Sequence, residues 1–548
     1  MALTKIKTSR KREHLLESLS PFQLKDDLIN LAEEESRKAA TVMLNAGRGN
    51  PNWVATTPRE AFFTLGLFGI EECRRVMDNA EGLAGIPEKK GIAKRFEKFL
   101  SANKTAPGID LLQKTYKYGL KQHGYDADSW VHELAESVIG DQYPVPDRML
   151  AHMEPIVHDY IIQEMCNNEP PAGKYDLFAV EGGTAAMCYI FDSLMQNFLI
   201  KKGDKIALMV PVFTPYIEIP ELDRYSFKVV EIKSNSMNKE GRHTWQYPDS
   251  ELEKLKDPSI RILFAVNPSN PPSAAIHPES LKKIVKIVKK DNPGLMVVTD
   301  DVYGTFVPGF KSLMAAIPYN TIGVYSFSKY FGCTGWRLGV IAIHQKNMFD
   351  DNIRRLSPAV TKTLNKRYGS ITLEPAKLTF IDRMVADSRQ VALNHTAGLS
   401  VPQQTQMMLF SAFALLDTKN KYKQLTQVLV QKRLKLLWDQ LEIPLVKDPL
   451  NAGYYSEIDI QVWAEKVYGD KFFKWLQQNF EPVDILFRLA EKTGVVLLNG
   501  GGFDGPEWSV RVSLANLPTE AYSVIGKRIT EIMREYAGVW KSNGTLKK

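Results

Sequence analysis

The chain has 548 residues, of which 44% are hydrophobic, so it is long enough for a large core and too long for one simple domain. Its 70 Lys and Arg residues slightly outnumber its 63 Asp and Glu residues, and this excess of +7 is spread along the chain, which argues against a nucleic-acid-binding protein. No apolar run approaches the length of a membrane span, so no membrane partner is expected.

The start of the chain and the cysteines indicate the cellular compartment. The basic run at residues 5–12 is interpreted as a solvated terminus, with a nucleic-acid-binding arm as the minor alternative. No apolar segment follows this charged start, so no secretory signal is predicted. The four cysteines form no C-x-x-C pair and have no histidines at zinc spacing. We therefore expect reduced thiols, no metal site and a cytoplasmic location.

The first third of the chain is predicted to be an arm followed by a helical insertion. In residues 1–57, a polar-faced helix over 24–43 leads into a loop at 44–53, where Gly47, Gly49 and Pro51 impose an irregular backbone. This loop either approaches a ligand closely or is an ordinary connecting turn. Residues 58–148 are helical in pattern, contain no catalytic motif and end in a rigid Tyr-Pro-Val-Pro turn.

Residues 149–350 alternate between helix and strand. The pattern predicts a helix over 149–166 and a strand over 177–180, followed by a glycine turn and a helix to 199. Five more apolar runs have the length of strands: 206–210, 228–232, 261–266, 295–299 and 321–325. Strands that are apolar throughout and separated by helices, such as the one over 279–290, predict a mainly parallel sheet.

Residues 351–548 are predicted to form a second domain of the α+β class. A charged helix over 422–441 connects the two domains. Short strands near 454–460, 495–498 and 508–514 are mixed with helices, and the last helix covers 519–536.

Polar residues follow several of the predicted parallel strands. Asn270 lies in the segment 267–272, Asp300 and Tyr303 follow the next strand, and Lys329 ends the run 326–329. Ligands of such sheets bind beyond the carboxyl ends of the strands. A lysine preceded by serines and followed eight residues later by Arg337 suits a carbonyl-phosphate cofactor, because the amine forms a Schiff base while hydroxyls and a guanidinium hold an anion. Taken alone, the lysine is more typical of a solvated loop, and the rest of the sequence reverses this interpretation.

This ordered set resembles the pyridoxal-phosphate enzymes of fold type I, the aspartate aminotransferase superfamily. The family carries an N-P-x-N-P element, then D-x-x-Y, then S-x-S-K with an arginine eight residues later, and a last arginine on a C-terminal strand. The matching residues are Asn270, Asp300, Tyr303, Ser326, Ser328, Lys329, Arg337 and Arg511. The segment Pro-Pro-Ser at 271–273 departs from the usual P-T-G. A closer similarity, to the aspartate 4-decarboxylase family, covers almost the whole chain and includes the loop at 44–53 and the helical insertion.

The resemblance implies a large domain with a mainly parallel sheet flanked by helices, and a smaller α+β domain built from the N-terminal arm and the C-terminal part. It also implies pyridoxal 5'-phosphate as the cofactor and removal of the β-carboxyl group of L-aspartate to give L-alanine and CO₂ through a ketimine, with minor aspartate transamination. The alternative is an ordinary aminotransferase of aspartate or a related amino acid. The resemblance implies a homo-oligomer that is at least a dimer, with several dimers joined in a larger assembly. A non-catalytic regulator on this fold is less favoured, because residues 1–60 contain no helix-turn-helix module.

The resemblance also assigns roles to residues around the cofactor ring. Lys329 is expected to bind the cofactor covalently and to move a proton at the substrate's α-carbon. Asp300 is expected to pair with the ring nitrogen, since Asp301 points to the other side of an extended segment. Tyr303 and Asn270 are expected to contact the ring oxygen. Stacking on the ring is assigned to Phe213.

The remaining implied contacts hold the phosphate and the substrate. The phosphate ligands are expected to be a helix start, two serines and an arginine: Gly183, Thr184, Ser326, Ser328 and Arg337. Tyr143 is expected to add a phosphate contact from a neighbouring subunit. Arg511, with Asn270 beside it, is expected to bind the substrate's α-carboxylate, because a planar guanidinium matches a carboxylate. Arg48 is a candidate for binding the second carboxylate or for gating the site, and Gly47 and Gly49 on either side of it are the alternative important positions of this loop.

Overall fold

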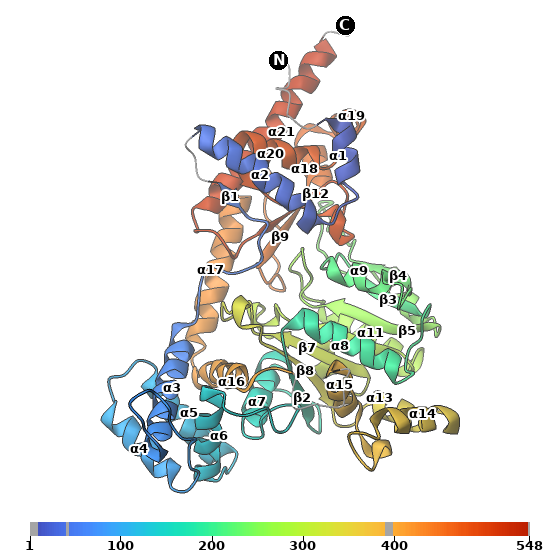
Figure 1. Cartoon of the computed structure of the whole chain (residues 1–548). Helices are drawn as coiled ribbons and strands as arrows, with labels where there is room; N and C mark the ends of the chain where they lie inside the picture. The colour runs from blue at the N-terminus through green and yellow to red at the C-terminus, as the bar shows by residue number, and fades with distance from the viewer. Residues whose placement is uncertain (1–8, 40–42, 390–397, 546–548) are drawn as a thin grey trace.

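In the computed structural model, the protein folds into two domains of unequal size joined by a long helix (Figure 1). The structure describes residues 9–39, 43–389 and 398–545. The first part of the basic run and residues 40–42 of the helix predicted over 24–43 lie outside these ranges. Among the helices of the described residues, none is both long and apolar enough to cross a membrane.

The large domain contains a seven-stranded sheet with the strand order β2-β8-β7-β6-β5-β3-β4. Neighbours from β4 to β7 pair in parallel, while β8 pairs antiparallel with both β2 and β7. This confirms the predicted, mainly parallel sheet. The strands are β2 (Tyr175–Val180), β3 (Lys205–Val210), β4 (Lys228–Lys233), β5 (Ile260–Val266), β6 (Met296–Asp300), β7 (Thr321–Ser326) and β8 (Gly339–His344).

Helices cover both faces of this sheet, which explains why its central strands are apolar throughout. On β5, Ile262 and Phe264 face a core shared with α8 (Gly183–Gln196) and α15 (Phe380–Arg389). The alternate residues Leu263 and Ala265 face a core shared with α11 (Pro278–Lys290). Because successive side chains on a strand point to opposite faces, the sheet lies between two helical layers. It thereby presents only its ends to solvent and ligands.

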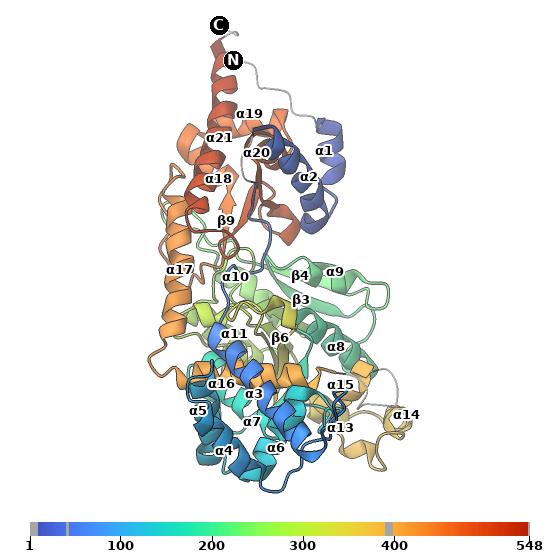
Figure 2. The same cartoon turned by 60° about the vertical axis from the view of Figure 1, so that its left-hand side comes forward.

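The helical insertion shares its core with the large domain. Phe68, Phe96 and Trp130 are buried in one cluster with residues of α7 (Met153–Met165) and α16 (Val401–Leu416). The inserted helices gather at the lower end of the molecule, beside α16 (Figure 2). They are α3 (Thr56–Val76), α4 (Ile92–Ala102), α5 (Ile109–Gln122) and α6 (Ala127–Ile139).

The small domain combines both ends of the chain. Its three-stranded antiparallel sheet has the order β11-β12-β9, and a separate pair joins β1 (Leu44–Asn45) in parallel to β10 (Val495–Val496). Leu24 and Leu28 of the N-terminal helix are buried in its core. The elements are α2 (Pro21–Ala39), β9 (Tyr455–Asp459), α18 (Ile460–Tyr468), α19 (Asp470–Asn479), α20 (Asp484–Thr493), β11 (Leu498–Asn499), β12 (Ser509–Ser513) and α21 (Ala521–Thr545). α17 (Lys421–Trp438) runs along the molecule from α16 to this domain (Figures 1 and 2).

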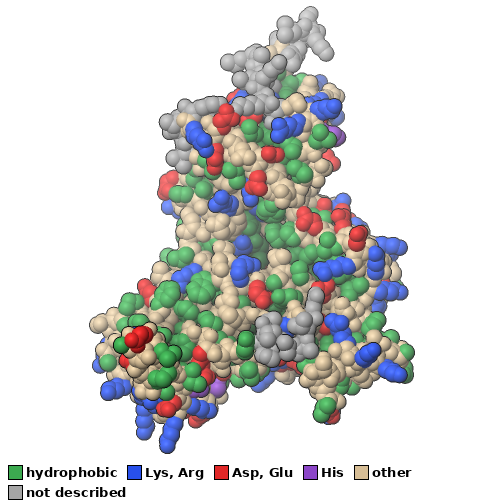
Figure 3. Space-filling view, viewed as in Figure 1, with side chains coloured by type: hydrophobic (Ala, Val, Ile, Leu, Met, Phe, Trp, Pro, Cys, Tyr) green, Lys and Arg blue, Asp and Glu red, His purple; other side chains and the backbone are tan. Residues whose placement is uncertain are grey.

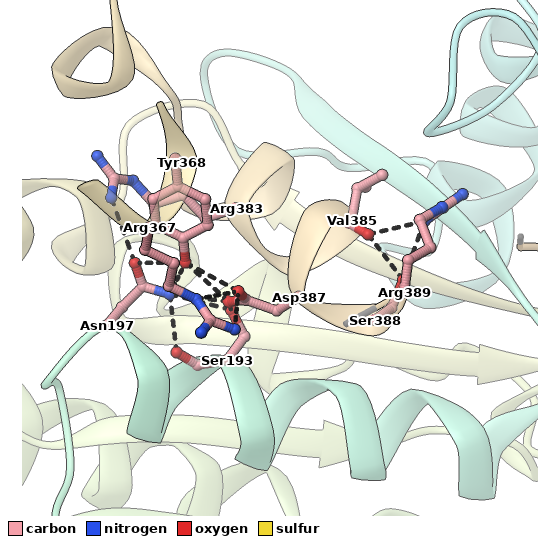
Figure 4. A network of polar contacts seen from close by, with 9 residues as sticks. All are labelled: Ser193, Asn197, Arg367, Tyr368, Arg383, Val385, Asp387, Ser388 and Arg389. Carbon is pink, nitrogen blue, oxygen red and sulfur yellow. Dashed lines mark hydrogen bonds and ion pairs between the residues drawn. The ribbon is translucent and has the colours of Figure 1, made fainter. Parts of the chain in front are cut away.

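A buried polar network fixes the carboxyl-terminal end of α8 (Figure 4). Asp387 on α15 accepts hydrogen bonds from the hydroxyls of Ser193 at 2.7 Å and Tyr368 at 2.9 Å, and it forms an ion pair with Arg367 at 2.9 Å. Asn197 donates its amide to the same carboxylate at 3.1 Å. Burial raises the pKa of Asp387, and these donors oppose that shift. The network therefore ties α8 to α15 and to α14 (Pro358–Tyr368).

The two-sided burial of the sheet predicts different costs for the same substitution at two positions. Val298 on β6 is completely buried, whereas Val229 on the edge strand β4 is 39% exposed. Removing two buried carbon atoms loses transfer free energy and leaves a cavity, so we expect Val298→Ala to lower the free energy of unfolding by about 2 kcal/mol. The matched control Val229→Ala should lower it by less than about 1 kcal/mol. Urea unfolding followed by fluorescence measures both, and equal losses would contradict burial of β6 on both faces.

Candidate active site

A cavity of about 350 Å³ opens where the carboxyl ends of the parallel strands face the small domain. The surface is hollowed where the two domains meet (Figure 3). Most of the residues singled out in the sequence line this cavity: Gly183, Thr184, Phe213, Asn270, Asp300, Tyr303, Ser326, Ser328, Lys329, Arg337 and Arg511. The structure therefore brings together side chains from four strand ends, one helix start and the distant strand β12.

Lys329 lies three residues beyond the end of β7, and its amine contacts the loop at 44–53. Its Nζ donates a hydrogen bond to the carbonyl oxygen of Gly49 at 3.1 Å. A Cβ atom on Gly49 would lie 2.5 Å from the hydroxyl oxygen of Tyr455 and 3.5 Å from this Nζ. Position 49 therefore requires glycine because the main chain approaches both side chains closely. Of the two interpretations of this loop, the close approach to the site is the one that the structure shows.

Asp300, at the end of β6, presents a buried carboxylate to the cavity. Its Oδ2 accepts a hydrogen bond from the hydroxyl of Tyr216 at 2.6 Å, and its Oδ1 accepts one from the backbone N–H of Val302 at 3.2 Å. Burial raises its pKa, while these two donors and the charge of Lys329 act in the opposite direction. Asp301 points away from the cavity and accepts hydrogen bonds from the hydroxyls of Thr299 and Ser312. The two adjacent carboxylates thus have different surroundings.

One end of the cavity has the features of an anion site. α8 begins at Gly183, so the backbone N–H groups of its first turn are free of intrahelical partners. The hydroxyls of Ser326 and Ser328 lie 3.1 Å apart beside it. Arg337 donates to the carbonyl oxygen of Glu181 at 3.2 Å, and a Cβ atom on Gly182 would lie 2.5 Å from its Nη2. The guanidinium is thereby held against the helix start.

Arg511 lies at the other end of the cavity and is only 1% exposed. Its Nη1 donates to Oδ1 of Asn270 at 3.2 Å and its Nη2 to the carbonyl oxygen of Gly47 at 2.9 Å, while its Nε has no partner. Its Cζ lies 4.5 Å from the ring centre of Tyr455 and 4.9 Å from that of Phe503. Within the described ranges, no carboxylate forms an ion pair with it. A buried guanidinium that forms no such ion pair is suited to bind a carboxylate of a ligand.

Glu457 lies opposite Arg511 in the pairing of β9 with β12. Burial raises its pKa to about 8. Its Oε1 accepts a hydrogen bond from the hydroxyl of Ser509 at 3.0 Å, and its Oε2 has no partner. At neutral pH this acid is protonated, so it leaves the positive charge of Arg511 uncompensated.

Three aromatic residues of the cavity were not identified from the sequence. Phe22 reaches it from α2, with its ring 5.7 Å from that of Phe213. Tyr216 lies three residues after Phe213 and bonds to Asp300, and Tyr455 begins β9. The position of Tyr216, three residues after Phe213, was the one local feature of the sequence that could have placed it at the cavity. Phe213 itself meets the ring of Tyr216 edge to face, with the centres 5.6 Å apart.

Two of the singled-out residues do not line the cavity of this chain. Arg48 is exposed, although Gly47 and Gly49 on either side of it contact Arg511 and Lys329. Tyr143 is 61% exposed. A phosphate contact by Tyr143 from a second subunit remains a prediction.

The sequence matches the family described as "Aminotransferase class I and II" over residues 178–529. It is 48% identical over 530 residues to the bifunctional aspartate aminotransferase and L-aspartate beta-decarboxylase of Pseudomonas sp, covering 96% of this chain and 98% of that protein. Nicotianamine aminotransferase 1 of Oryza sativa subsp. japonica is 29% identical over 212 residues, 38% of each chain. The fold is similar to that of aspartate aminotransferase from Thermus thermophilus with maleate, with a TM-score of 0.57 and 15% identity over 96% of this chain and 100% of the other. Aromatic aminotransferase from Pyrococcus horikoshii OT3 gives a TM-score of 0.56 and 17% identity over 93% of this chain and 99% of the other.

The raised pKa of Glu457 predicts a pH dependence of stability. Between pH 4.5, the ordinary value, and about 8, the folded state holds a proton that the unfolded state has released. The resulting stabilisation is fully present below pH 4.5 and is lost as the pH rises through about 8. We expect Glu457→Gln to remove this loss, so its free energy of unfolding should fall less than that of the wild type across this interval.

Urea unfolding at a series of pH values measures the difference. Glu507→Gln, at an exposed position, is the matched control and should follow the wild-type curve. Parallel curves for Glu457→Gln and the wild type would contradict the assignment of a buried, protonated acid at position 457.

Proposed function

The chain belongs to the class I and II aminotransferase family, and from this premise we propose that it removes the β-carboxyl group of L-aspartate to release L-alanine and CO₂, with a lesser aspartate aminotransferase activity. The observation that carries the proposal is the 48% identity over 96% of the chain to a protein named for both activities. The family uses pyridoxal phosphate. When bound, this cofactor withdraws electrons from the bonds at the substrate's α-carbon.

The residues at the anion end of the cavity fit the phosphate group of pyridoxal 5'-phosphate. The N–H groups at the start of α8, the hydroxyls of Ser326 and Ser328 and the guanidinium of Arg337 can all donate hydrogen bonds to it. Glycine is favoured at 182 because the backbone there has a φ of +92° and a Cβ would lie 2.5 Å from Nη2 of Arg337. This set of donors would hold a dianion without an accompanying metal ion.

The middle of the cavity fits the pyridine ring. Asp300 would pair with a protonated ring nitrogen, and the hydroxyl of Tyr216 keeps that carboxylate oriented and favours its charged form. Tyr303 and Asn270 would donate hydrogen bonds to the ring oxygen, and Phe213 would stack on the ring. Lys329 would supply the amine that binds the cofactor and later takes the proton from the substrate's α-carbon.

Arg511 would bind the substrate's α-carboxylate. Its guanidinium is buried, has an Nε without a partner and lies at the end of the cavity opposite the phosphate-binding residues. A planar guanidinium binds a carboxylate through two parallel hydrogen bonds. The ring of Tyr455 and the amide of Asn270 hold it in place.

The charges along the cavity favour decarboxylation over transamination of aspartate. Among the described residues that line it, the cationic side chains are Lys329, Arg337 and Arg511. With these engaged by the cofactor and the α-carboxylate, no further cationic side chain among the described lining residues is left to neutralise the β-carboxylate. A carboxylate left unstabilised in the ground state has a lower barrier to loss of CO₂, because binding energy is not spent on the ground state.

The protein would work as a homo-oligomer. The smallest form would be a dimer, and several dimers would join in a larger assembly. The support from this chain is an exposed apolar row on α3, where Phe63, Leu67 and Ile70 are 62%, 63% and 44% exposed. Such rows mark surfaces that other protein chains cover. Tyr143 would contact the phosphate of a neighbouring subunit in that assembly, and Arg48 is the candidate in the loop for gating or for the second carboxylate.

Product analysis tests the proposed reaction. With L-aspartate and pyridoxal 5'-phosphate, we expect alanine and CO₂ to form in equal amounts and to exceed oxaloacetate. Addition of 2-oxoglutarate should reveal the lesser aminotransferase activity. If oxaloacetate predominates when 2-oxoglutarate is the acceptor, the protein is an ordinary aminotransferase and decarboxylation is not its main reaction.

The role of Lys329 is tested by spectroscopy. The wild-type protein should show a visible absorbance band that borohydride removes, since an imine is reduced by borohydride. Lys329→Ala should lack this band and should lower alanine formation by at least about 10²-fold. Lys282→Ala on the exposed surface of α11 is the matched control, with band and activity retained. A wild-type protein without such a band would contradict the assignment of the cofactor.

A further inference from the structure

Tyr455 lines the cavity, and its hydroxyl lies close to the main chain at Gly49. Tyr455 is 2% exposed and begins β9, so its ring is fixed by the small-domain sheet. A Cβ built on Gly49 would meet both its hydroxyl oxygen and Nζ of Lys329. The phenol and the amine therefore approach the same point of the main chain, from the small and the large domain respectively.

The hydrogen bonds around Tyr455 leave its proton available. The hydroxyl of Tyr303 donates to the oxygen of Tyr455 at 3.1 Å. Within the described part of the chain, the Tyr455 hydroxyl donates to no acceptor. Its neighbour Tyr454 differs, because its hydroxyl donates to the carbonyl oxygen of Gly49 at 2.9 Å. Of these adjacent tyrosines, one has its proton engaged by the backbone and the other has it free.

Arg511 is placed to stabilise the negative charge that Tyr455 would acquire on losing this proton. Its Cζ lies 4.5 Å from the centre of the ring. This interaction grows stronger as the oxygen becomes charged, in surroundings from which water is largely excluded.

The proposed reaction needs a second acid besides Lys329. Conversion of aspartate to alanine and CO₂ consumes one proton, and that proton ends on the β-carbon. The carbon–carbon bond to the β-carboxyl group breaks, and its electron pair returns to the β-carbon to form a carbon–hydrogen bond. The amine of Lys329 is already assigned to the α-carbon, where a proton is removed and later replaced.

On the basis of the proposed function, we propose that Tyr455 is the acid that protonates the β-carbon after CO₂ has left. Its O–H bond breaks as the new C–H bond forms, and water restores the proton to the phenolate in each cycle. The hydroxyl of Tyr455 thereby serves decarboxylation alone, because the transamination half-reaction ends without a new proton on the β-carbon.

The test is the ratio of products formed by Tyr455→Phe. This variant keeps the ring that packs on Arg511 and removes only the hydroxyl. We expect alanine formation to fall by about 10²-fold, while oxaloacetate formation with 2-oxoglutarate present changes by less than about threefold. The solvent deuterium isotope effect on alanine formation should rise, because protonation becomes the slow step. Binding of succinate, measured by calorimetry, should change by less than about threefold, since Arg511 remains in place.

Tyr454→Phe is the matched control. It removes a hydroxyl from the same cluster, and it should change alanine and oxaloacetate formation by the same factor. The assignment is overturned if Tyr455→Phe lowers both products equally, or if it leaves alanine formation unchanged. A wild-type enzyme that forms oxaloacetate but no alanine would overturn the proposed decarboxylation itself, and this role with it.

Discussion

Arg511 holds a positive charge almost completely out of water, and no carboxylate of the described residues neutralises it in an ion pair. Removing an unpaired ion from water costs several kcal/mol. That cost is offset by Asn270 from the large domain, by the carbonyl of Gly47 from the N-terminal loop and by the aromatic ring of Tyr455 from the small domain. The charge thus determines how three separate parts of the chain meet. It remains incompletely satisfied until an anion reaches its Nε.

The part of the site on the large sheet follows from the sequence because parallel strands bring their carboxyl ends to one edge. Asp300 and Lys329 end strands or follow them closely, so the order of apolar runs was sufficient to place them together. Phe22 and Tyr455 could not be placed in this way. Phe22 enters through the packing of α2 on the small domain, and the face occupied by Tyr455 is decided by the pairing of β9 with β12. Neither is a property of a local pattern.

The loop at 44–53 shows a different limit of sequence reasoning. Its charged residue, Arg48, was the candidate for binding a carboxylate. In the structure, the main-chain oxygens of the glycines beside it accept hydrogen bonds from Arg511 and Lys329. The loop follows β1 and is not itself a strand, and its main chain approaches Arg511 and Lys329 at Gly47 and Gly49 while Arg48 is exposed. The position of this loop depends on the parallel pairing of β1 with β10, which only the folded chain defines.

The residues that would bind the cofactor and the arginine that would bind the substrate lie in different domains. The first set is on the large sheet and on α8, whose far end is immobilised by the Asp387 network, while Arg511 is carried by the small-domain sheet. A small rotation between these domains alters the distance between Arg511 and the residues that would bind the cofactor. It leaves the arrangement of the cofactor-binding residues themselves unchanged. Substrate specificity can therefore change through substitutions confined to the small domain, while the large domain keeps the residues that support bond breaking.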